Sequence, residues 1–342
     1  MSPPADIEAA LAGKPRRWLV TGAAGFIGSH LVERLLALGH NVVGVDDLST
    51  GHRKNLEQAV AGGGLNAKVR FRFIEGDLSD HAVARAACAE SEFVLHQAAV
   101  GSVPRSIQDP LRTHRANVDG FASLIEAARL AKVERLVFAS SSSVYGDDPR
   151  LPKRVGEEGR LLSPYAASKK ANEILAQAYA QAYGFPVVGL RYFNVFGPRQ
   201  DPNGAYAAVI PRWIAALSRG EVCEIFGDGE TARDFCYVAN VVQANLKAAL
   251  AAPEAVRGQV FNVAAGGRTT LKVLYASLRD QVATNSPAAA KLEPVFKPFR
   301  AGDIRDSHAD LSQTAAAIGY APTHTLREGL VPTVASFLGA KA

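Results

Sequence analysis

Short apolar runs alternate along this chain with longer segments in which apolar residues recur at helical spacing. The apolar runs are continuous, as in strands that are buried on both faces; they are WLVTG (18–22), NVVGVDD (41–47), VRFRFIEGD (69–77), EFVLHQAA (92–99), VERLVFASSSS (133–143) and VVGLRYF (187–193). Helices are predicted between them, including residues 108–131 and 164–183. The alternation predicts an α/β fold, with a doubly wound parallel (Rossmann) sheet covered by helices on both faces.

The regular pattern ends after Phe193. Segments rich in Pro and Gly follow, including 197–206 and 226–234, and such segments are typical of loops over a binding cleft. We therefore expect a second lobe. The sheet domain is predicted to comprise residues 1–192 and 236–264, and a smaller, discontinuous α/β lobe is predicted to comprise residues 193–235 and 265–342. A surface loop is predicted at residues 285–291.

The composition of the chain argues against several functional classes. The 342 residues are 48% hydrophobic, and the net charge of +5 comes from Lys and Arg scattered singly, which argues against a nucleic-acid partner. No stretch reaches the roughly 20 apolar residues of a membrane span, and the start of the chain lacks the apolar core of a signal peptide. Three widely spaced cysteines and eight histidines without ligand spacing predict no disulfide framework and no metal site. These features favour a cytoplasmic protein without membrane partners.

A glycine-rich turn lies between the first strand and the next helix. Gly22, Gly25 and Gly28 follow that strand in the spacing G-x-x-G-x-x-G. Glycines let the phosphates of a dinucleotide approach the backbone, and the helix N-terminus offers a positive dipole end. Such a triplet also occurs in purely structural turns, so the strand before it and the helix after it carry the interpretation.

The second strand ends in a pair of acids. Asp46 stands at about the distance past the glycines at which a carboxylate meets the adenosine ribose. Asp47 follows, and a second acid would repel a 2′-phosphate. The pair therefore predicts NAD rather than NADP. The alternative is that both acids are solvated turn residues.

The segment SPYAASKK (163–170) puts Tyr165 and Lys169 four positions apart, on one face of a helix. A free tyrosine has a pKa of about 10 and is a poor base at neutral pH. The Lys169 ammonium would favour the phenolate, and the nicotinium ring of bound NAD⁺ would add a second positive charge. The pair is therefore predicted to transfer protons, although an exposed Tyr–Lys pair without function is the alternative.

Four serines, residues 140–143, end the strand 133–143 at the carboxyl edge of the sheet, where ligands of such folds bind. Ser141 is the serine expected to face a substrate hydroxyl. The predicted catalytic residues are thus Ser141, Tyr165 and Lys169.

These motifs resemble those of the extended short-chain dehydrogenase/reductase family, and more closely those of the nucleotide-sugar 4-epimerases. The resemblance extends from end to end and is carried by TGAAGFIGSHL, VLHQAAVGSVPRSIQDP, SPYAASK, RYFNVFGPRQDPNGAYAAVIPRW, FGDGETARDFCYV and FRAGDIRDSHAD. Within that group the chain is most similar to the bacterial UDP-N-acetylglucosamine 4-epimerases of surface-polysaccharide synthesis. The resemblance also implies a homodimer, formed through a four-helix bundle of residues 108–131 and 164–183 with their copies.

The chemistry that the resemblance implies is an isomerisation. Tyr165 would remove the proton from the sugar O4 while the C4 hydride passes to NAD⁺, which leaves a transient 4-keto sugar. The sugar would swing about its diphosphate linkage and take the hydride back on its other face. NAD would remain bound to the enzyme, and UDP-GlcNAc and UDP-GalNAc would be interconverted, with UDP-Glc and UDP-Gal as further candidate substrates.

The resemblance assigns binding residues position by position. Around NAD it implies Gly22, Gly25, Phe26, Ile27, Gly28, Asp46, Asp77, Leu78, Gln97, Ala98, Ala99, Asn117, Tyr165, Lys169 and Tyr192. Around the UDP-sugar it implies Gly101, Ser102, Val103, Ser141, Ser142, Ser143, Asn194, Ala207, Ala208, Val209, Ile210, Arg233, Arg300, Asp303 and Ser307. The arginines suit phosphate because a planar charged fork holds two oxygens at once, although each alone would also fit a surface salt bridge.

Ser307 bears on the choice of sugar. In the related epimerases a bulky tyrosine at the matching position restricts turnover to UDP-glucose and UDP-galactose, whereas a small residue leaves room for the N-acetyl group. The resemblance therefore implies N-acetylated substrates for this chain.

Three further residues carry expectations of their own. Lys170 stands where near relatives often have an aromatic residue, and it is expected to point to solvent because the neighbouring ammonium repels it. Asn240 stands near a position where many relatives have an acid, so it has no assigned role. His96 follows a buried strand and is expected to be structural.

Other functions of this fold would require different residues. Sugar 4,6-dehydratases commonly carry an Asp–Glu pair at the place of Ser142 and Ser143, and UDP-glucuronate decarboxylases tend to carry a glutamate there. A 4-epimerase of UDP-uronic acids (UDP-GlcA or UDP-GlcNAcA) stays open, because Arg105 or Arg199 could reach a C6 carboxylate. A non-enzymatic NAD-sensing protein is disfavoured by the Tyr–Lys pair.

Overall fold

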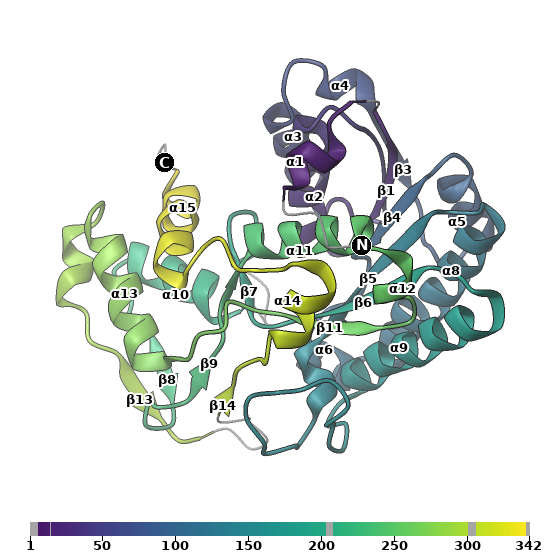
Figure 1. The fold of residues 1–342 in the computed structure, drawn as a ribbon. Helices are drawn as coiled ribbons and strands as arrows, with labels where there is room; N and C mark the ends of the chain where they lie inside the picture. Colours follow the sequence, from purple (N-terminus) through teal and green to yellow (C-terminus); the bar gives the residue numbers. More distant parts are fainter. Residues whose placement is uncertain (1–5, 14, 203–207, 300–305, 340–342) are drawn as a thin grey trace.

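Seven parallel strands form the central sheet (Figure 1). The computed structural model describes residues 6–13, 15–202, 208–299 and 306–339. The strand order is β11-β6-β5-β4-β1-β2-β3, with bounds Arg17–Thr21 (β1), Asn41–Asp46 (β2), Phe71–Glu75 (β3), Phe93–His96 (β4), Arg135–Ser141 (β5), Val187–Tyr192 (β6) and Val260–Val263 (β11). The order reverses between β1 and β4, and ligands of such sheets bind at the carboxyl ends of the strands there. The predicted doubly wound sheet is confirmed.

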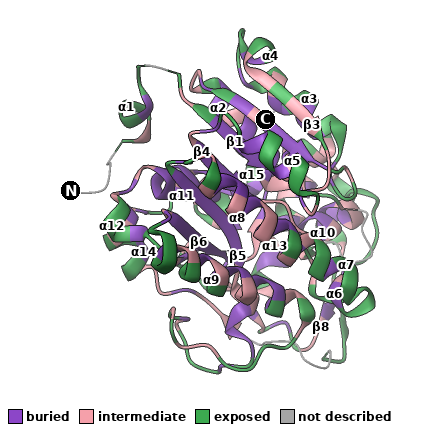
Figure 2. Ribbon diagram, turned by 90° about the vertical axis from the view of Figure 1, so that its right-hand side faces the viewer, coloured by how far each residue is buried: buried purple, intermediate pink, exposed green. Residues whose placement is uncertain are grey.

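Helices cover both faces of the sheet (Figure 2). One face packs against α2 (Phe26–Ala37), α3 (Arg53–Gly62) and α11 (Val238–Leu250), and the other against α5 (His81–Cys88), α8 (Gly120–Leu130) and α9 (Pro164–Tyr183). Trp18 and Val20 point into the first core and Leu19 into the second, because successive side chains of a strand alternate. Four short helices add to the first core: α1 (Ile7–Leu11), α4 (Ala67–Arg70), α12 (Pro253–Val256) and α14 (Ser312–Ile318).

A separate hydrophobic core lies beside the sheet domain, at the left in Figure 1. It is built by α10 (Val209–Ser218), α13 (Leu271–Ala283), α15 (Leu326–Leu338) and β8 (Glu224–Phe226). β8 pairs in parallel with the exposed strand β13 (Val295–Lys297). Short strands lie between this core and the sheet: β7 (Val195–Phe196) pairs with β10 (Cys236–Tyr237), and β9 (Ala232–Arg233) lies between β12 (Thr269–Thr270) and β14 (Asp306–Ser307).

The structure corrects two local expectations. Residues 108–131 do not form one helix: α6 (Val103–Gln108) and α7 (Pro110–His114) are followed by a π-helical turn (Arg115–Asp119) and then by α8. Pro110 has no amide donor with which to continue α6, and Asp109 instead caps α7. Residues 287–291 form a 3₁₀ helix where a loop was expected. Among the helices of the described ranges, none has the length and apolar character of a membrane span.

Candidate active site

The glycine turn after β1 has no room for a side chain at two of its positions. Gly22 has a φ of +65°, and a Cβ there would lie 2.7 Å from the amide nitrogen of Ala98. A Cβ on Gly28 would lie 2.0 Å from the carbonyl oxygen of Gly22. α2 begins at Phe26, and its N-cap, Gly25, supplies no capping side chain. The start of α2 is therefore open to an anion such as a pyrophosphate.

A cavity extends from this turn to the carboxyl end of β2. Its lining includes the predicted cofactor residues Gly22, Gly25, Asp46, Asp77, Leu78, Gln97, Ala98 and Ala99. Asp46 is buried, and its carboxylate accepts from the amides of Ala24 at 2.9 Å and Leu48 at 2.8 Å. Burial raises the pKa of this carboxyl above its usual value. Each oxygen keeps a further lone pair, so Asp46 can also accept from a ribose hydroxyl.

A second cavity, of about 380 Å³, joins the first along Gly22, Gly25, Gln97 and Ala99. The other predicted residues in its lining are Phe26, Ile27, Gly28, Gly101, Ser141, Tyr165, Lys169, Tyr192 and Asn194. The glycine turn and the predicted catalytic residues thus share one elongated site, as a dinucleotide and a reacting sugar require.

Tyr165 and Lys169 lie one turn apart on α9, beside the end of β5. Ser163 caps this helix by accepting from the amide of Ala166 at 3.1 Å, which fixes where the helix begins. The buried Lys169 ammonium donates to the carbonyl of Ala139 at 2.9 Å and lies 6.0 Å from the centroid of the Tyr165 ring. The two side chains therefore face the same cavity without a direct hydrogen bond between them.

Burial acts on both titrating groups of this pair. It lowers the pKa of Lys169 to about 8, and the carboxylate of Glu173 opposes that shift. It raises the pKa of Tyr165, and a hydrogen bond with Ser141 opposes that rise. The side chains around Tyr165 therefore keep it protonated. The sequence led us to expect that Lys169 would lower the pKa of Tyr165, but Lys169 alone does not do so. A further positive charge beside the hydroxyl would lower the pKa.

Asn117 is implied beside the cofactor by the resemblance, but it lies behind the cavity wall. It is fully buried on the π-helical turn, accepts from the amide of Val100 at 2.7 Å and donates to the hydroxyl of Ser168 at 3.0 Å. Ser168 precedes Lys169, so Asn117 fixes the segment after β4 to the catalytic helix. Single π-helical turns occur frequently at functional sites.

Lys170 does not point to solvent as expected. Its ammonium lies 3.5 Å from a carboxylate oxygen of Glu158 and 3.4 Å from one of Glu173. His96 is structural, as expected: its Nδ1 lies 2.7 Å from the hydroxyl of Thr21, and burial lowers its pKa to about 3.

A third cavity continues from the second across Asn194 towards the separate core. Asn194 has a φ of +32°, and its side chain donates to the carbonyl of Asp234 at 3.1 Å. The predicted residues Val209 and Arg233 line this cavity. β14 pairs Ser307 with Arg233 in parallel register. The predicted phosphate-binding arginine and the residue implied in sugar choice therefore lie side by side.

The remaining sugar-site predictions near the sheet fall on two short turns. Ser102 caps α6 by accepting from the amide of Arg105 at 3.4 Å, and Val103 begins that helix. Ser142 and Ser143 begin the 3₁₀ turn Ser142–Tyr145. The buried hydroxyl of Ser143 has no hydrogen-bond partner among the residues that the structure describes.

Besides Val209, two predictions fall on the start of α10. Ala208 is its N-cap, whereas Ile210 is 1% exposed and packs into the separate core, so its side chain does not face the cavity. Ala207, Arg300 and Asp303 lie outside the described residues.

Several lining residues of the third cavity were missed by the sequence interpretation, among them Arg212, Phe226 and Thr231. Phe226 offers a ring face on which a base could stack, and Arg212 offers a cation for phosphate. Arg212 follows Val209 by three positions on α10, a spacing that puts both on one helix face. That spacing was the available signal for Arg212. Phe226 and Thr231 lie in the segment 226–234, whose loop pattern hides which side chains face inward.

The model of the NAD dependent epimerase/dehydratase family matches residues 18–264. The chain belongs to this family. It is 41% identical over 323 residues to the UDP-glucose 4-epimerase of Mycolicibacterium smegmatis, and the match covers 94% of this chain and 98% of that protein. A solved UDP-N-acetylglucosamine 4-epimerase from Methanobrevibacter ruminantium has a TM-score of 0.85 at 36% identity, covering 96% of this chain and 99% of that one. A mutant UDP-glucuronic acid 4-epimerase from Bacillus cereus, solved with NAD, has a TM-score of 0.83 at 28% identity, covering 94% and 99%.

These findings confirm the predicted family, the predicted enzyme class and NAD as the cofactor. The residues fit NAD, because the turn excludes side chains where a pyrophosphate would approach and a buried carboxylate stands at the ribose end. The three relatives carry three different sugars in their names, so the sugar has to be argued from the site.

Proposed function

We propose that this chain is a UDP-N-acetylglucosamine 4-epimerase that interconverts UDP-GlcNAc and UDP-GalNAc, with UDP-Glc and UDP-Gal as further substrates. The observation that carries the choice of sugar is Ser307. Ser307 is paired with Arg233, which lines the third cavity, and the resemblance implies that a tyrosine at this position would occupy the space needed by an N-acetyl group. The similarity to a solved UDP-GlcNAc 4-epimerase supports the same choice.

In this proposal Tyr165 takes the proton from O4 of the sugar and later returns it. Ser141, hydrogen-bonded to Tyr165, orients the sugar hydroxyl, and the positive charges of Lys169 and bound NAD⁺ together would favour the phenolate. Bound NAD supplies a reversible acceptor for the hydride of C4. A placed proton-transfer group contributes roughly 10² to 10⁴ in rate.

The diphosphate is the group that Arg233 would hold, since a guanidinium fork binds two phosphate oxygens at once. The unpaired hydroxyl of Ser143 would accept or donate to the sugar while it turns over between its two orientations. Such a rotation requires that the diphosphate is bound tightly and that the sugar ring makes few polar contacts.

The test is a panel of UDP-GlcNAc, UDP-Glc and their uronic acids, incubated side by side with the purified protein. Proton NMR reads the configuration at C4. We expect epimerisation with the highest kcat/KM on UDP-GlcNAc. Turnover of the uronic acids alone, or of no UDP-sugar, would contradict the proposal.

The uronic-acid alternative has less support from the site. Arg199, one of the two arginines considered for a C6 carboxylate, lies 2.5 Å from Glu33 and has a side chain that is 8% exposed. Its charge is therefore already paired. Arg105 on α6 is the arginine that remains for that role.

We further infer a homodimer through a four-helix bundle. Large apolar side chains on the segments 108–131 and 164–183 are exposed, including Leu111 (82%) and Ile174 (58%), and so is Ile107 (63%) just before the first of them. A groove between α7 and α9 is lined by Pro110, Leu111, His114, Val118, Pro164, Ala167, Ser168 and Ala171. Light scattering should give twice the chain mass, and Leu111→Glu together with Ile174→Glu should give the monomer; a monomeric wild-type protein would contradict the inference.

We also propose that residues 1–192 and 236–264 hold NAD, and that residues 193–235 and 265–342 hold the UDP-sugar. The buried members of the separate core all come from the latter ranges, although Ile318 and Tyr320 pack into the sheet core. The three free and buried cysteines accord with the predicted cytoplasmic location, and surface-polysaccharide synthesis is the proposed use of the product.

A further inference from the structure

Glu173 extends the catalytic face of α9 by one turn. Tyr165, Lys169 and Glu173 follow each other at intervals of four residues, so their side chains share a face of the helix. The first two contact the carboxyl end of β5: Tyr165 is hydrogen-bonded to Ser141, and Lys169 donates to the carbonyl of Ala139 at 2.9 Å. The residue between these two strand positions is the one that Glu173 contacts.

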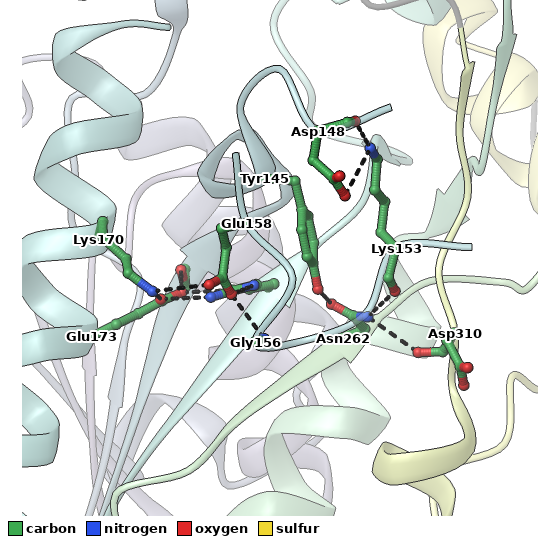
Figure 3. A network of polar contacts seen from close by, with 11 residues as sticks. Tyr145, Asp148, Lys153, Gly156, Glu158, Lys170, Glu173, Asn262 and Asp310 are labelled. Carbon is green, nitrogen blue, oxygen red and sulfur yellow. Dashed lines mark hydrogen bonds and ion pairs between the residues drawn. The ribbon is translucent and has the colours of Figure 1, made fainter. Parts of the chain in front are cut away.

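Ser140 donates its hydroxyl proton to Oε1 of Glu173 at 2.6 Å. Arg191 on β6 donates to both carboxylate oxygens of Glu173, each at 2.8 Å. Glu158, from the loop after β5, lies 2.6 Å from the remaining terminal nitrogen of Arg191, and Lys170 lies close to both carboxylates. Figure 3 shows Lys170, Glu158 and Glu173 converging at this point.

The centre of the cluster is shut off from water, whereas Lys170 and Glu158 at its edge keep side-chain exposures of 31% and 17%. The side chains of Arg191 and Glu173 are 1% and 5% exposed, and Ser140 is 3% exposed. Apolar side chains of similar volume would fill such a space at least as stably, so packing alone does not account for ionised groups here. The bidentate contact between Arg191 and Glu173 fixes the orientation of the two side chains, because both hydrogen bonds must be aligned at once.

We propose that Glu173 is a positioning residue: through Ser140 and Arg191 it locks the catalytic face of α9 in register with β5. The proposal rests on the proposed epimerase function, in which this face supplies the proton-transfer group. A misplacement of about 1 Å at a reacting group can cost about 100-fold in rate, so a lock of this kind bears directly on turnover.

Glu173 also balances the charge around Lys169. The groups that face Lys169 are Tyr165 and Glu173 from its own helix, His96 from β4 and, behind Glu173, Arg191 from β6. His96 is neutral because burial lowers its pKa to about 3. The Glu173 carboxylate raises the pKa of Lys169 against the burial that lowers it to about 8. Without that carboxylate, Arg191 would keep only Glu158 as its counter-charge, and its positive charge would act more strongly on Lys169.

The experiment compares Glu173→Gln and Ser140→Ala in the full-length protein. Glu173→Gln keeps the shape of the side chain and removes its charge. We expect kcat to fall at least tenfold while KM stays within about twofold of the wild-type value. The alkaline limb of the pH profile of kcat should move about one pH unit lower, because Lys169 loses its proton at a lower pH. Ser140→Ala removes one hydrogen bond to Glu173 and leaves the ion pair with Arg191. In this variant kcat should fall about threefold, and the alkaline limb of its pH profile should not move.

The matched control is Glu92→Gln. Glu92 is also paired with an arginine, at 2.7 Å from Arg16, but it lies at the amino edge of the sheet, where β4 begins. Neither kcat nor the alkaline limb should change in this variant. If Glu173→Gln lowers thermal stability but keeps the kcat and the limb of the wild type, Glu173 is structural alone and the proposal is overturned.

Two further measurements keep the outcome decisive. Should Glu173→Gln fail to fold, Glu173→Gln/Arg191→Gln removes both buried charges together, and wild-type kcat in that double variant overturns the proposal. The absorbance of tyrosinate, taken as the difference between each protein and its Tyr165→Phe derivative, should titrate at lower pH in Glu173→Gln, because a negative charge near the phenolate has been removed. That titration needs no turnover. If the wild type epimerises no UDP-sugar, the proposed function is wrong, but the titration still decides the role of Glu173.

Discussion

A methyl group added to Gly28 would collide with the turn that faces the pyrophosphate. Its Cβ would lie 2.0 Å from the carbonyl oxygen of Gly22, which is 1.4 Å short of the 3.4 Å at which ordinary contact begins. The obstacle is backbone, so no rotamer change relieves it. Overpacking of this kind costs about 1–3 kcal/mol, against a gain of about 1 kcal/mol when alanine replaces a helical glycine. We expect Gly28→Ala to lower the free energy of unfolding by about 1 kcal/mol and to weaken NAD binding at least tenfold, since the turn must move by more than 1 Å.

Gly120→Ala is the matched control. Gly120 opens α8 with a φ of −59°, and the nearest heavy atom to a Cβ there would lie at 3.7 Å, an ordinary contact. The same substitution should therefore raise the melting temperature and leave NAD binding unchanged. Thermal denaturation followed by circular dichroism measures the first quantity, and calorimetry on protein stripped of its cofactor measures the second. Wild-type NAD affinity in Gly28→Ala would refute the reasoning.

Ser307→Tyr should reduce kcat/KM for UDP-GlcNAc at least tenfold and leave that for UDP-Glc within about threefold, because a large side chain would fill the space for the N-acetyl group; full activity on the acetylated sugars would exclude this steric explanation. Asn240→Ala should lower the free energy of unfolding by about 2–3 kcal/mol in chemical denaturation, because the buried amide oxygen accepts from the backbone of Thr323 and His324. An unchanged denaturation midpoint would show that these hydrogen bonds contribute little. The kcat of the wild type should fall as the pH rises through about 8, since burial lowers the pKa of Lys169 to that value and the charged form is the active one. A kcat that stays level to about pH 10 would contradict the role of the ammonium.

The sequence was informative where local pattern decides the structure. Continuous apolar runs predicted the buried parallel strands, because both faces of such strands are covered. The spacing of Tyr165 and Lys169 predicted a shared helix face, and the structure has both on α9 with a common cavity. The glycine turn was predicted from its place between a strand and a helix, and the steric closeness at Gly22 accounts for the glycine there.

The sequence was less informative where distant segments meet. Lys170 was expected to point to solvent because of its neighbour Lys169, but Glu158, twelve positions earlier on a loop, comes within ion-pair distance. The position of Asn117 behind the cavity wall follows from the π-helical turn, which no spacing rule predicts. The pairing of Ser307 with Arg233 depends on two short strands more than seventy positions apart, so it required the fold.

The most direct test of the account is the conversion of UDP-GlcNAc by Tyr165→Phe, followed by proton NMR of the C4 configuration. The account predicts a fall in kcat of at least about 100-fold, with the NAD content of the wild type, because the substitution removes the proton-transfer group and leaves the glycine turn intact. A variant that retains more than about a tenth of the wild-type kcat would contradict the central role of the Tyr165 hydroxyl.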